Sequence, residues 1–93
     1  MAYLQTHFWP GGTEAQYQAT VAVVHPGDGL PQGQLVHAAG PTDGGMLILV
    51  VWDSKESSER FMSETLLPAL PLDGGLVGPP EERVAEAVAF QQP

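Results

Sequence analysis

Residues 45–52, Gly-Met-Leu-Ile-Leu-Val-Val-Trp, form the longest unbroken apolar run in the chain. Successive side chains of a strand point to opposite faces of its sheet, so this run presents apolar side chains on both faces. A strand that is apolar on both faces has to be buried on both faces. The sequence therefore predicts a central strand over residues 46–52 and a cover for each side of its sheet.

Three further segments, residues 2–9, 34–39 and 82–90, have the alternation of strands. In the first, one face carries Leu4, Thr6 and Phe8, and the other carries Tyr3, Gln5, His7 and Trp9. In the second, Leu35, His37 and Ala39 are expected to share a face. The Gly/Pro-rich cluster at residues 40–44 predicts a reverse turn, and with it an antiparallel hairpin between the second strand and the central one.

Two helices are predicted between the strands. The first begins at Thr13, where a hydroxyl followed three residues later by Gln has the form of a capping box. It continues to His25, whose place in the last turn suits a positive charge, and Pro26 is expected to stop it. The second helix covers residues 53–67, starts with a carboxylate or hydroxyl cap, and is expected to end or kink near Pro68.

The predicted order is β-α-β-β-α-β, within one domain of residues 1–93. With right-handed crossovers, this order gives an α+β, ferredoxin-like sandwich: a four-stranded antiparallel sheet with two helices on one face. Two helices cover only one face, although the central strand is apolar on both. The simplest cover for the second face is another copy of the chain in a homodimer. A partner of different sequence or a further domain is the alternative.

The net charge of the chain limits the kinds of partner that it can bind. Three Lys+Arg stand against eleven Asp+Glu, a net charge of −8, which disfavours nucleic acid and anionic membrane surfaces. The chain has no cysteine, so it has no disulfide and no thiolate metal ligand. The N-terminus does not read as a signal peptide, and the apolar run is far shorter than the ~20 residues that cross a bilayer. We expect a cytoplasmic protein with no membrane association.

Three strings carry a family resemblance: HFWPGGT at residues 7–13, GQLVHAAGPT at 33–42 and VWDSKE at 51–56. Together with the length and element order, they resemble the dimeric α/β-barrel superfamily of small ferredoxin-like proteins, near the antibiotic-biosynthesis-monooxygenase-like group. The resemblance implies a homodimer, or dimeric α/β barrel, whose sheets face each other. It also implies a ligand pocket in each protomer between sheet and helices.

The chain departs from the active sites of the group it resembles. The cofactor-free, quinone-forming monooxygenases rely on an Asn with Trp residues, and this chain contains no Asn. Haem-degrading members use a helical His, which the second predicted helix lacks. Cyclase-like members use a Tyr on that helix and a His just after it, where this chain offers Phe61 and Leu67. No active site of the family transfers whole.

Histidines are the candidates for acid–base chemistry, because imidazole titrates near neutrality. His7 and His37 fall on predicted strands, and either could take a proton from an acidic aromatic or enol substrate. The alternative is that each is a hydrogen-bonded structural residue, which is the better interpretation for His25. Glu86 is the carboxylate that we expect to pair with His7. A metal held by His7, His37 and Glu86 is a weaker alternative, and we predict no metal and no cofactor.

The residues predicted to bind an aromatic substrate are Tyr17, Trp52, Trp9 and Phe61. Tyr17 and Trp52 carry a polar group near the end of an element, whereas core packing is the stronger interpretation of Phe61, because it already explains the spacing of that residue.

Two functions remain open. The first is a cofactor-free small-molecule enzyme of the monooxygenase, cyclase or isomerase type, acting on an aromatic or polyketide-like substrate by His-assisted proton abstraction. The second is a non-catalytic dimeric barrel that binds a hydrophobic ligand or a partner protein. The enzyme requires a cavity of roughly several hundred cubic ångströms with a histidine on its wall.

Overall fold

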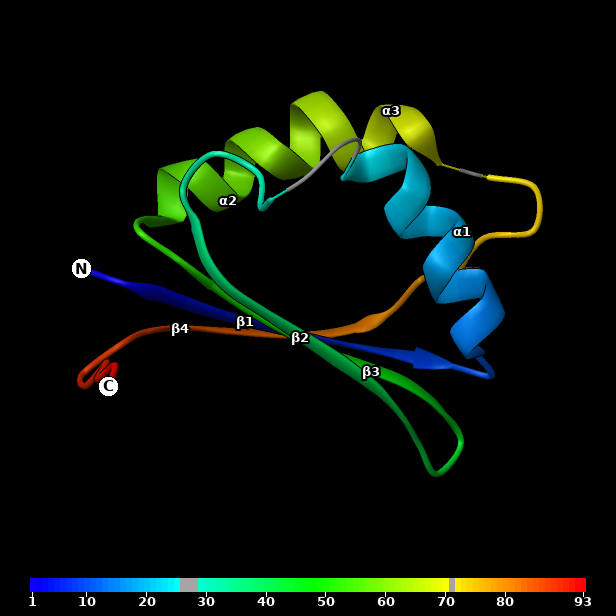
Figure 1. Cartoon of the computed structure of the whole chain (residues 1–93), viewed down its shortest axis with the longest axis horizontal. Helices are drawn as coiled ribbons and strands as arrows, with labels where there is room; N and C mark the ends of the chain where they lie inside the picture. The colour runs from blue at the N-terminus through cyan, green and yellow to red at the C-terminus, as the bar shows by residue number, and fades with distance from the viewer. Residues whose placement is uncertain (26–28, 71) are drawn as a thin grey trace.

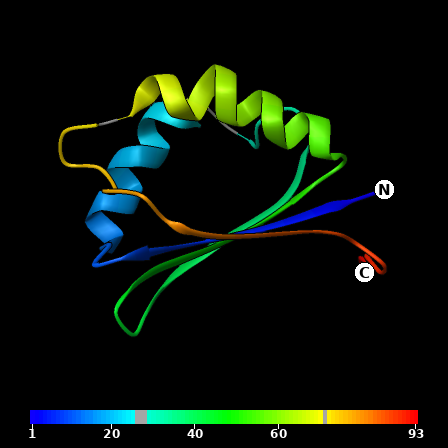
Figure 2. The ribbon, with the colours of Figure 1, turned by 180° about the vertical axis from the view of Figure 1, so that it is seen from behind.

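The structure, a computed structural model, describes residues 1–25, 29–70 and 72–93. Its elements in chain order are β1 (Tyr3–Pro10), α1 (Glu14–Val24), β2 (Gln34–Thr42), β3 (Gly45–Trp52), α2 (Lys55–Phe61), the π-helix η1 (Met62–Leu66), α3 (Leu67–Ala69) and β4 (Glu81–Glu86). The strands form one antiparallel sheet in the order β2-β3-β1-β4. α1 and α2 lie on the same face of this sheet (Figures 1 and 2). The predicted ferredoxin-like α+β fold is therefore confirmed.

The central position of β3 follows from its apolar side chains. It pairs with β1 on one side and β2 on the other. Its helix-facing residues form the core together with residues of β1 and a later loop: Tyr3, Trp9, Met46, Ile48, Val50, Trp52 and Leu76. On the opposite face, Leu47 and Leu49 are 45% and 40% exposed. The prediction that β3 is apolar on both faces holds, and the helices cover one of them.

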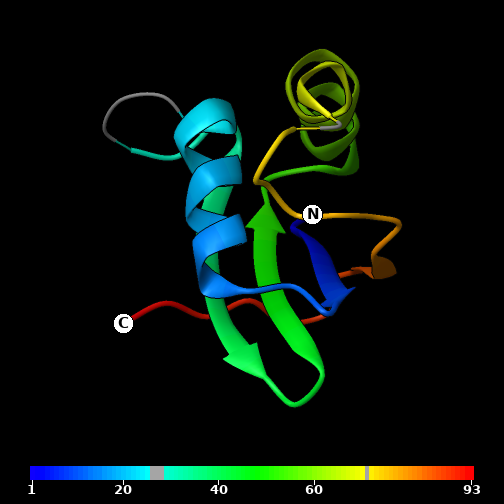
Figure 3. The ribbon, with the colours of Figure 1, turned by 90° about the vertical axis from the view of Figure 1, so that its right-hand side faces the viewer.

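The start of α1 is set by the predicted capping box. The Thr13 hydroxyl accepts a hydrogen bond from the Gln16 amide at 3.1 Å, and the Gln16 side chain accepts one from the Thr13 amide at 3.0 Å. The helix ends at His25, whose amide donates to the Val21 carbonyl. Pro26, the expected stop, lies outside the described residues. Figure 3 shows α1 beside α2, which is viewed nearly end-on.

The second helical segment differs from the regular helix that was predicted. Its start agrees with the predicted carboxylate or hydroxyl cap, because the Ser54 hydroxyl accepts a hydrogen bond from the Ser57 amide at 3.2 Å. After α2, the chain forms the π-helix η1 and then continues through Pro68 to Ala69. Proline has no amide hydrogen to donate within a helix, and here it sits in a short final segment directly after the π-helical turn. Within the described part of the chain, no helix is long and apolar enough to span a membrane.

Two strand predictions need correction. In β2, an irregularity between Gln34 and Val36 takes Leu35 out of the pairing with β3. Leu35 and His37 therefore do not form the simple alternating face that was expected. β4 ends at Glu86, not at residue 90, because its partner β1 begins opposite that residue. Val88, predicted inside the strand, is 98% exposed.

Candidate active site

A cavity of about 60 Å³ lies between the sheet and the helices. Strands β1, β2 and β3 and helices α1 and α2 all contribute to its wall, because each directs side chains to the same side of the sheet. The wall contains all six residues predicted for the site: His7, Trp9, Tyr17, His37, Trp52 and Phe61. The sequence could not assign a sheet face to the two strand histidines. The structure places both on the helix side, although their roles stay predictions.

The volume of the cavity limits what it can hold. An apolar cavity of about 150 Å³ binds benzene, and about 10–15 Å³ of cavity volume is enough to hold one water molecule. The partly open space of about 60 Å³ is therefore smaller than a cavity that binds benzene, and it has room for a few water molecules. It falls short of the several hundred cubic ångströms expected for an enzyme of this kind, so a ligand needs further space.

One end of the cavity carries a cluster of rings. The Tyr17 hydroxyl and His37 Nε2 are hydrogen-bonded at 2.5 Å. The His25 ring lies edge-on to His37, with centroids 5.1 Å apart, and 5.8 Å from the ring of Phe61. Tyr17 reaches this point because it lies on the cavity-facing side of α1, and His37 because it pairs with a helix-facing residue of β3. Burial raises the pKa of Tyr17, so its hydroxyl stays protonated at neutral pH.

Burial also lowers the pKa of His37, and it lowers the pKa of His25 together with the nearby charge of protonated His37. Both rings are therefore neutral at neutral pH. The expectation that His25 suits a positive charge at the helix end is wrong, because burial and the neighbouring His37 both disfavour its protonated form.

Acidification is expected to destabilise the fold through these two residues. The unfolded chain takes up their protons below about pH 6.5, whereas the folded chain does so only at lower pH. The contribution of these two histidines to the free energy of unfolding is therefore complete above about pH 6.5. It falls as the pH drops towards their folded-state pKa values. Thermal unfolding at about pH 8 and about pH 5.5 measures this loss. His25→Gln should reduce it, and an equal loss in the variant would show that His25 is not responsible.

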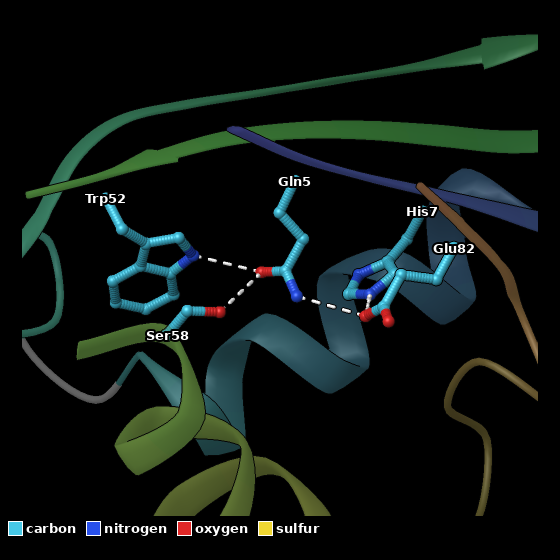
Figure 4. A network of polar contacts seen from close by, with 5 residues as sticks. All are labelled: Gln5, His7, Trp52, Ser58 and Glu82. Carbon is cyan, nitrogen blue, oxygen red and sulfur yellow. Dashed lines mark hydrogen bonds and ion pairs between the residues drawn. The ribbon is translucent and has the colours of Figure 1, made fainter. Parts of the chain in front are cut away.

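A second polar network crosses the cavity wall at His7 (Figure 4). His7 Nε2 lies 2.7 Å from Glu82 Oε2, and the Gln5 amide donates to the same oxygen at 3.0 Å. The partner predicted for His7 was Glu86, and that prediction is wrong. The register of β4 places Glu82 opposite His7 and Glu86 opposite Tyr3. Among the described residues, no group of three or more His, Asp or Glu is placed to hold a metal ion.

The hydrogen bonds fix the orientation of this network. The indole N–H of Trp52 can only donate, and it donates to Gln5 Oε1 at 2.9 Å. Ser58 Oγ donates to the same oxygen at 3.3 Å. The amide nitrogen of Gln5 must then face Glu82, whose oxygen accepts. The oxygens of an ionised carboxylate accept hydrogen bonds and cannot donate them. His7 Nε2 therefore carries the hydrogen, and Nδ1 is the basic nitrogen.

Three buried polar atoms of the cavity-lining residues have no hydrogen-bond partner within the described structure: Trp9 Nε1, Gln34 Oε1 and His37 Nδ1. Buried polar groups are normally paired, so these atoms are available to a ligand or to water. Sequence reasoning missed Gln5, Gln34 and Glu82. The only signal for Gln5 was its place on the face that also carries His7, and Glu82 needed the strand register.

Solved structures with the same fold were found. The chain superposes on a candidate antibiotic biosynthesis monooxygenase from Chloroflexus aurantiacus J-10-fl with a TM-score of 0.68 and 21% identity, covering 99% of this chain and 98% of the other. It superposes on SnoaB, a cofactor-independent oxygenase from Streptomyces nogalater crystallised as a mutant, with a TM-score of 0.61 and 17% identity, covering 96% and 94%. No protein-family profile and no curated protein matches the sequence. The chain thus shares, over nearly its whole length, the ferredoxin-like fold of antibiotic-biosynthesis-monooxygenase-like proteins.

Proposed function

We propose that this protein is a cofactor-independent enzyme that removes a proton from an acidic aromatic or polyketide-like substrate, which then reacts with molecular oxygen. The observation that carries the proposal is the His7–Glu82 pair on the wall of an apolar cavity. The fold likeness to a cofactor-independent oxygenase supports it. His7 is the base, and Glu82 is the residue that positions it.

The chemistry follows from the orientation of the pair. The substrate proton moves to His7 Nδ1, and the Nε2–H donated to Glu82 stabilises the imidazolium that forms. The negative charge stays on the substrate as an enolate or phenolate. Molecular oxygen then adds to the electron-rich carbon, and loss of water from the peroxide converts a ring methylene into a carbonyl. One oxygen atom enters the product, and the other leaves as water with the two hydrogens of the methylene, so no external reductant is needed.

The unpartnered polar atoms suit the ionised substrate. Trp9 Nε1–H can only donate, so it would stabilise an oxygen that gains negative charge as the proton leaves. Gln34 Oε1 can only accept, so it would bind a substrate hydroxyl. Together they favour a substrate with a carbonyl or phenol oxygen and a separate hydroxyl group.

The test is turnover by the purified protein. Hydroxylated anthrones and naphthols, which ionise readily, are incubated with the protein in air, and oxygen uptake is followed. The methyl ethers formed at their enol or naphthol oxygen serve as controls, because the blocked oxygen cannot carry the negative charge. We expect oxygen uptake with the free hydroxyl compounds and a carbonyl product that carries one atom of isotopically labelled molecular oxygen. If no acidic aromatic compound is oxidised faster than in buffer, the proposed enzyme function is wrong.

A non-catalytic binding protein is the second candidate, and the small volume of the cavity favours it. Such a protein would bind the same compounds without consuming oxygen. Equilibrium binding measured beside the oxygen uptake therefore separates the two functions.

We also propose that the helix-free face of the sheet is covered by a second copy of the chain. The support is its exposed apolar residues, among them Leu47 and Leu49 on the central strand. Leu49→Lys would bury an unpaired charge in that interface, at a cost of several kcal/mol. We expect a dimer at micromolar concentration and a dissociation constant raised about 100-fold or more in the variant. Sedimentation equilibrium measures both.

Val23→Lys is the matched control for this dimer. Val23 lies on α1, on the helix side of the sheet, and is itself exposed, so a lysine there should leave association unchanged. A wild-type chain that sediments as a folded monomer would contradict the dimer.

A further inference from the structure

A second hollow, of about 410 Å³, lies outside the cavity, between the α2–η1 segment and strands β1 and β4. We call it the outer groove, and its lining includes Gln5, Ser58, Met62, Ser63, Glu82 and Val84. Gln5 and Met62 also line the inner cavity. Two side chains therefore lie between the small inner cavity and a larger, more open hollow.

We propose that the outer groove is the second half of the binding site, and that it holds a polar arm of a ligand whose aromatic part reaches the inner cavity past Gln5 and Met62. The proposal rests on the proposed function for the aromatic part. It adds a subsite, with a chemistry of its own, that the catalytic residues do not define. The inner cavity alone is too small for benzene, whereas the two hollows together reach the volume of ordinary ligand sites.

The two separating side chains are suited to move. Met62 is unbranched and adapts readily to changes in packing. It is also the first residue of the π-helix η1, and π-helical turns occur frequently at functional sites. Gln5 is buried, and its side-chain amide makes hydrogen bonds to Trp52, Ser58 and Glu82. A ligand with a hydroxyl or carbonyl group could take over those bonds when the amide moves aside.

The polar groups of the groove define the arm. Glu82 has 44% of its side chain exposed, and one of its oxygens is not used by His7 or Gln5. Glu59 also lines the groove, as do the hydroxyls of Ser58 and Ser63. The two carboxylates accept hydrogen bonds and repel anions, and the hydroxyls can donate or accept. The arm therefore carries hydroxyl or amino groups, and a carboxylate or phosphate arm is excluded.

The absence of cysteine from the chain allows the groove to be blocked after folding. Ser63→Cys places a single thiol in the groove, and N-benzylmaleimide attached to it fills the space. Glu64→Cys is the matched control, because the neighbouring residue of the same helix lines a different hollow. The probe is a hydroxylated anthrone, held under nitrogen so that it is not oxidised. Fluorescence of Trp9 and Trp52, which both line the inner cavity, reports its binding.

We expect the label to raise the dissociation constant of the probe by about tenfold or more relative to the unlabelled Ser63→Cys variant, while the same label at Glu64→Cys changes it by no more than about twofold. Bound probe should also slow the labelling of Ser63→Cys. An anthrone with an aminomethyl arm should bind about tenfold more tightly than one with a carboxymethyl arm. Equal affinities would contradict the chemistry assigned to the groove.

A different hollow next to the inner cavity is the alternative location of the second subsite, and it gives a third position for the label. A hollow of about 300 Å³ beside His25 shares Val24 and Phe61 with the inner cavity and includes Gln32. If the label blocks binding at Gln32→Cys and not at Ser63→Cys, the outer groove is not the second subsite. Binding that the Ser63 label blocks, without turnover in air, would overturn the proposed function alone. Turnover that the label leaves unchanged would overturn the subsite alone, and a wild-type protein that binds no probe would overturn both.

Discussion

His7→Gln is expected to lower kcat for the acidic aromatic substrate by about 10²- to 10⁴-fold, the range that a positioned general base contributes. A glutamine amide can still donate to Glu82, so the hydrogen bond across β1 and β4 is kept. What it lacks is the basic Nδ1 nitrogen of the imidazole ring. The measurement is steady-state oxygen uptake, with the circular dichroism spectrum and melting temperature recorded to show that the fold is intact.

His25→Gln is the control for this substitution, because His25 lines the same cavity but holds no carboxylate partner in the network around His7. Its kcat should stay within a few-fold of wild type. His37→Gln decides between the two histidines that the sequence named as catalytic. If His37→Gln abolishes turnover while His7→Gln retains the wild-type rate, the base is His37, with Tyr17 as its hydrogen-bonded partner.

Trp52→Ala is expected to reduce the free energy of unfolding by about 3–5 kcal/mol, the usual cost of truncating a buried aromatic residue. Trp52 is 1% exposed and is one of the largest fully buried side chains. Its ring packs against Phe61 with centroids 5.4 Å apart, and its N–H binds Gln5. For a chain of this length, each kcal/mol lowers the melting temperature by about 4–8 °C. The free energy of unfolding of a natural domain is only about 5–15 kcal/mol, so the variant would be close to unfolding.

A second variant separates packing from hydrogen bonding at Trp52, and a substitution at an exposed residue is the control. Trp52→Phe keeps most of the apolar ring and removes the N–H, so it should cost less than the alanine variant. Val88→Ala, at a residue that is 98% exposed, should change stability by no more than about 0.5 kcal/mol. Urea titration gives all three values. A Trp52→Ala protein as stable as wild type would show that the Trp52–Phe61 packing is not a main support of the core.

The local chemistry of the sequence predicted the elements and their order. Thr13 and Gln16 set the start of α1 through side-chain hydrogen bonds within a few residues, as the capping box requires. The apolar run predicted β3 as the central strand, and alternation separated the two faces of β1. The prediction from the local sequence was wrong from Met62 onward, where a π-helix replaces the predicted regular helix before Pro68.

The candidate site was predicted as a set of residue types, and all six predicted residues lie on one cavity wall. Their grouping depended on which face of the sheet each strand residue occupies. Within one strand, the sequence shows which residues share a face. It does not show which faces of two different strands lie on the same side of the sheet. The bulge at Leu35 and the pairing of β4 with β1 decide how these faces match, and neither depends on the local sequence alone.

By itself, the sequence determined the order of the main elements, the fold class and the apolar character of both sheet faces, because these depend on periodicity and capping over short stretches. Only the tertiary structure decided that Glu82, and not Glu86, faces His7, and that Gln5 lies between the cavity and the outer groove. The physical reason is that strand register is set by packing between residues far apart in the chain, such as the 75-residue separation of His7 and Glu82.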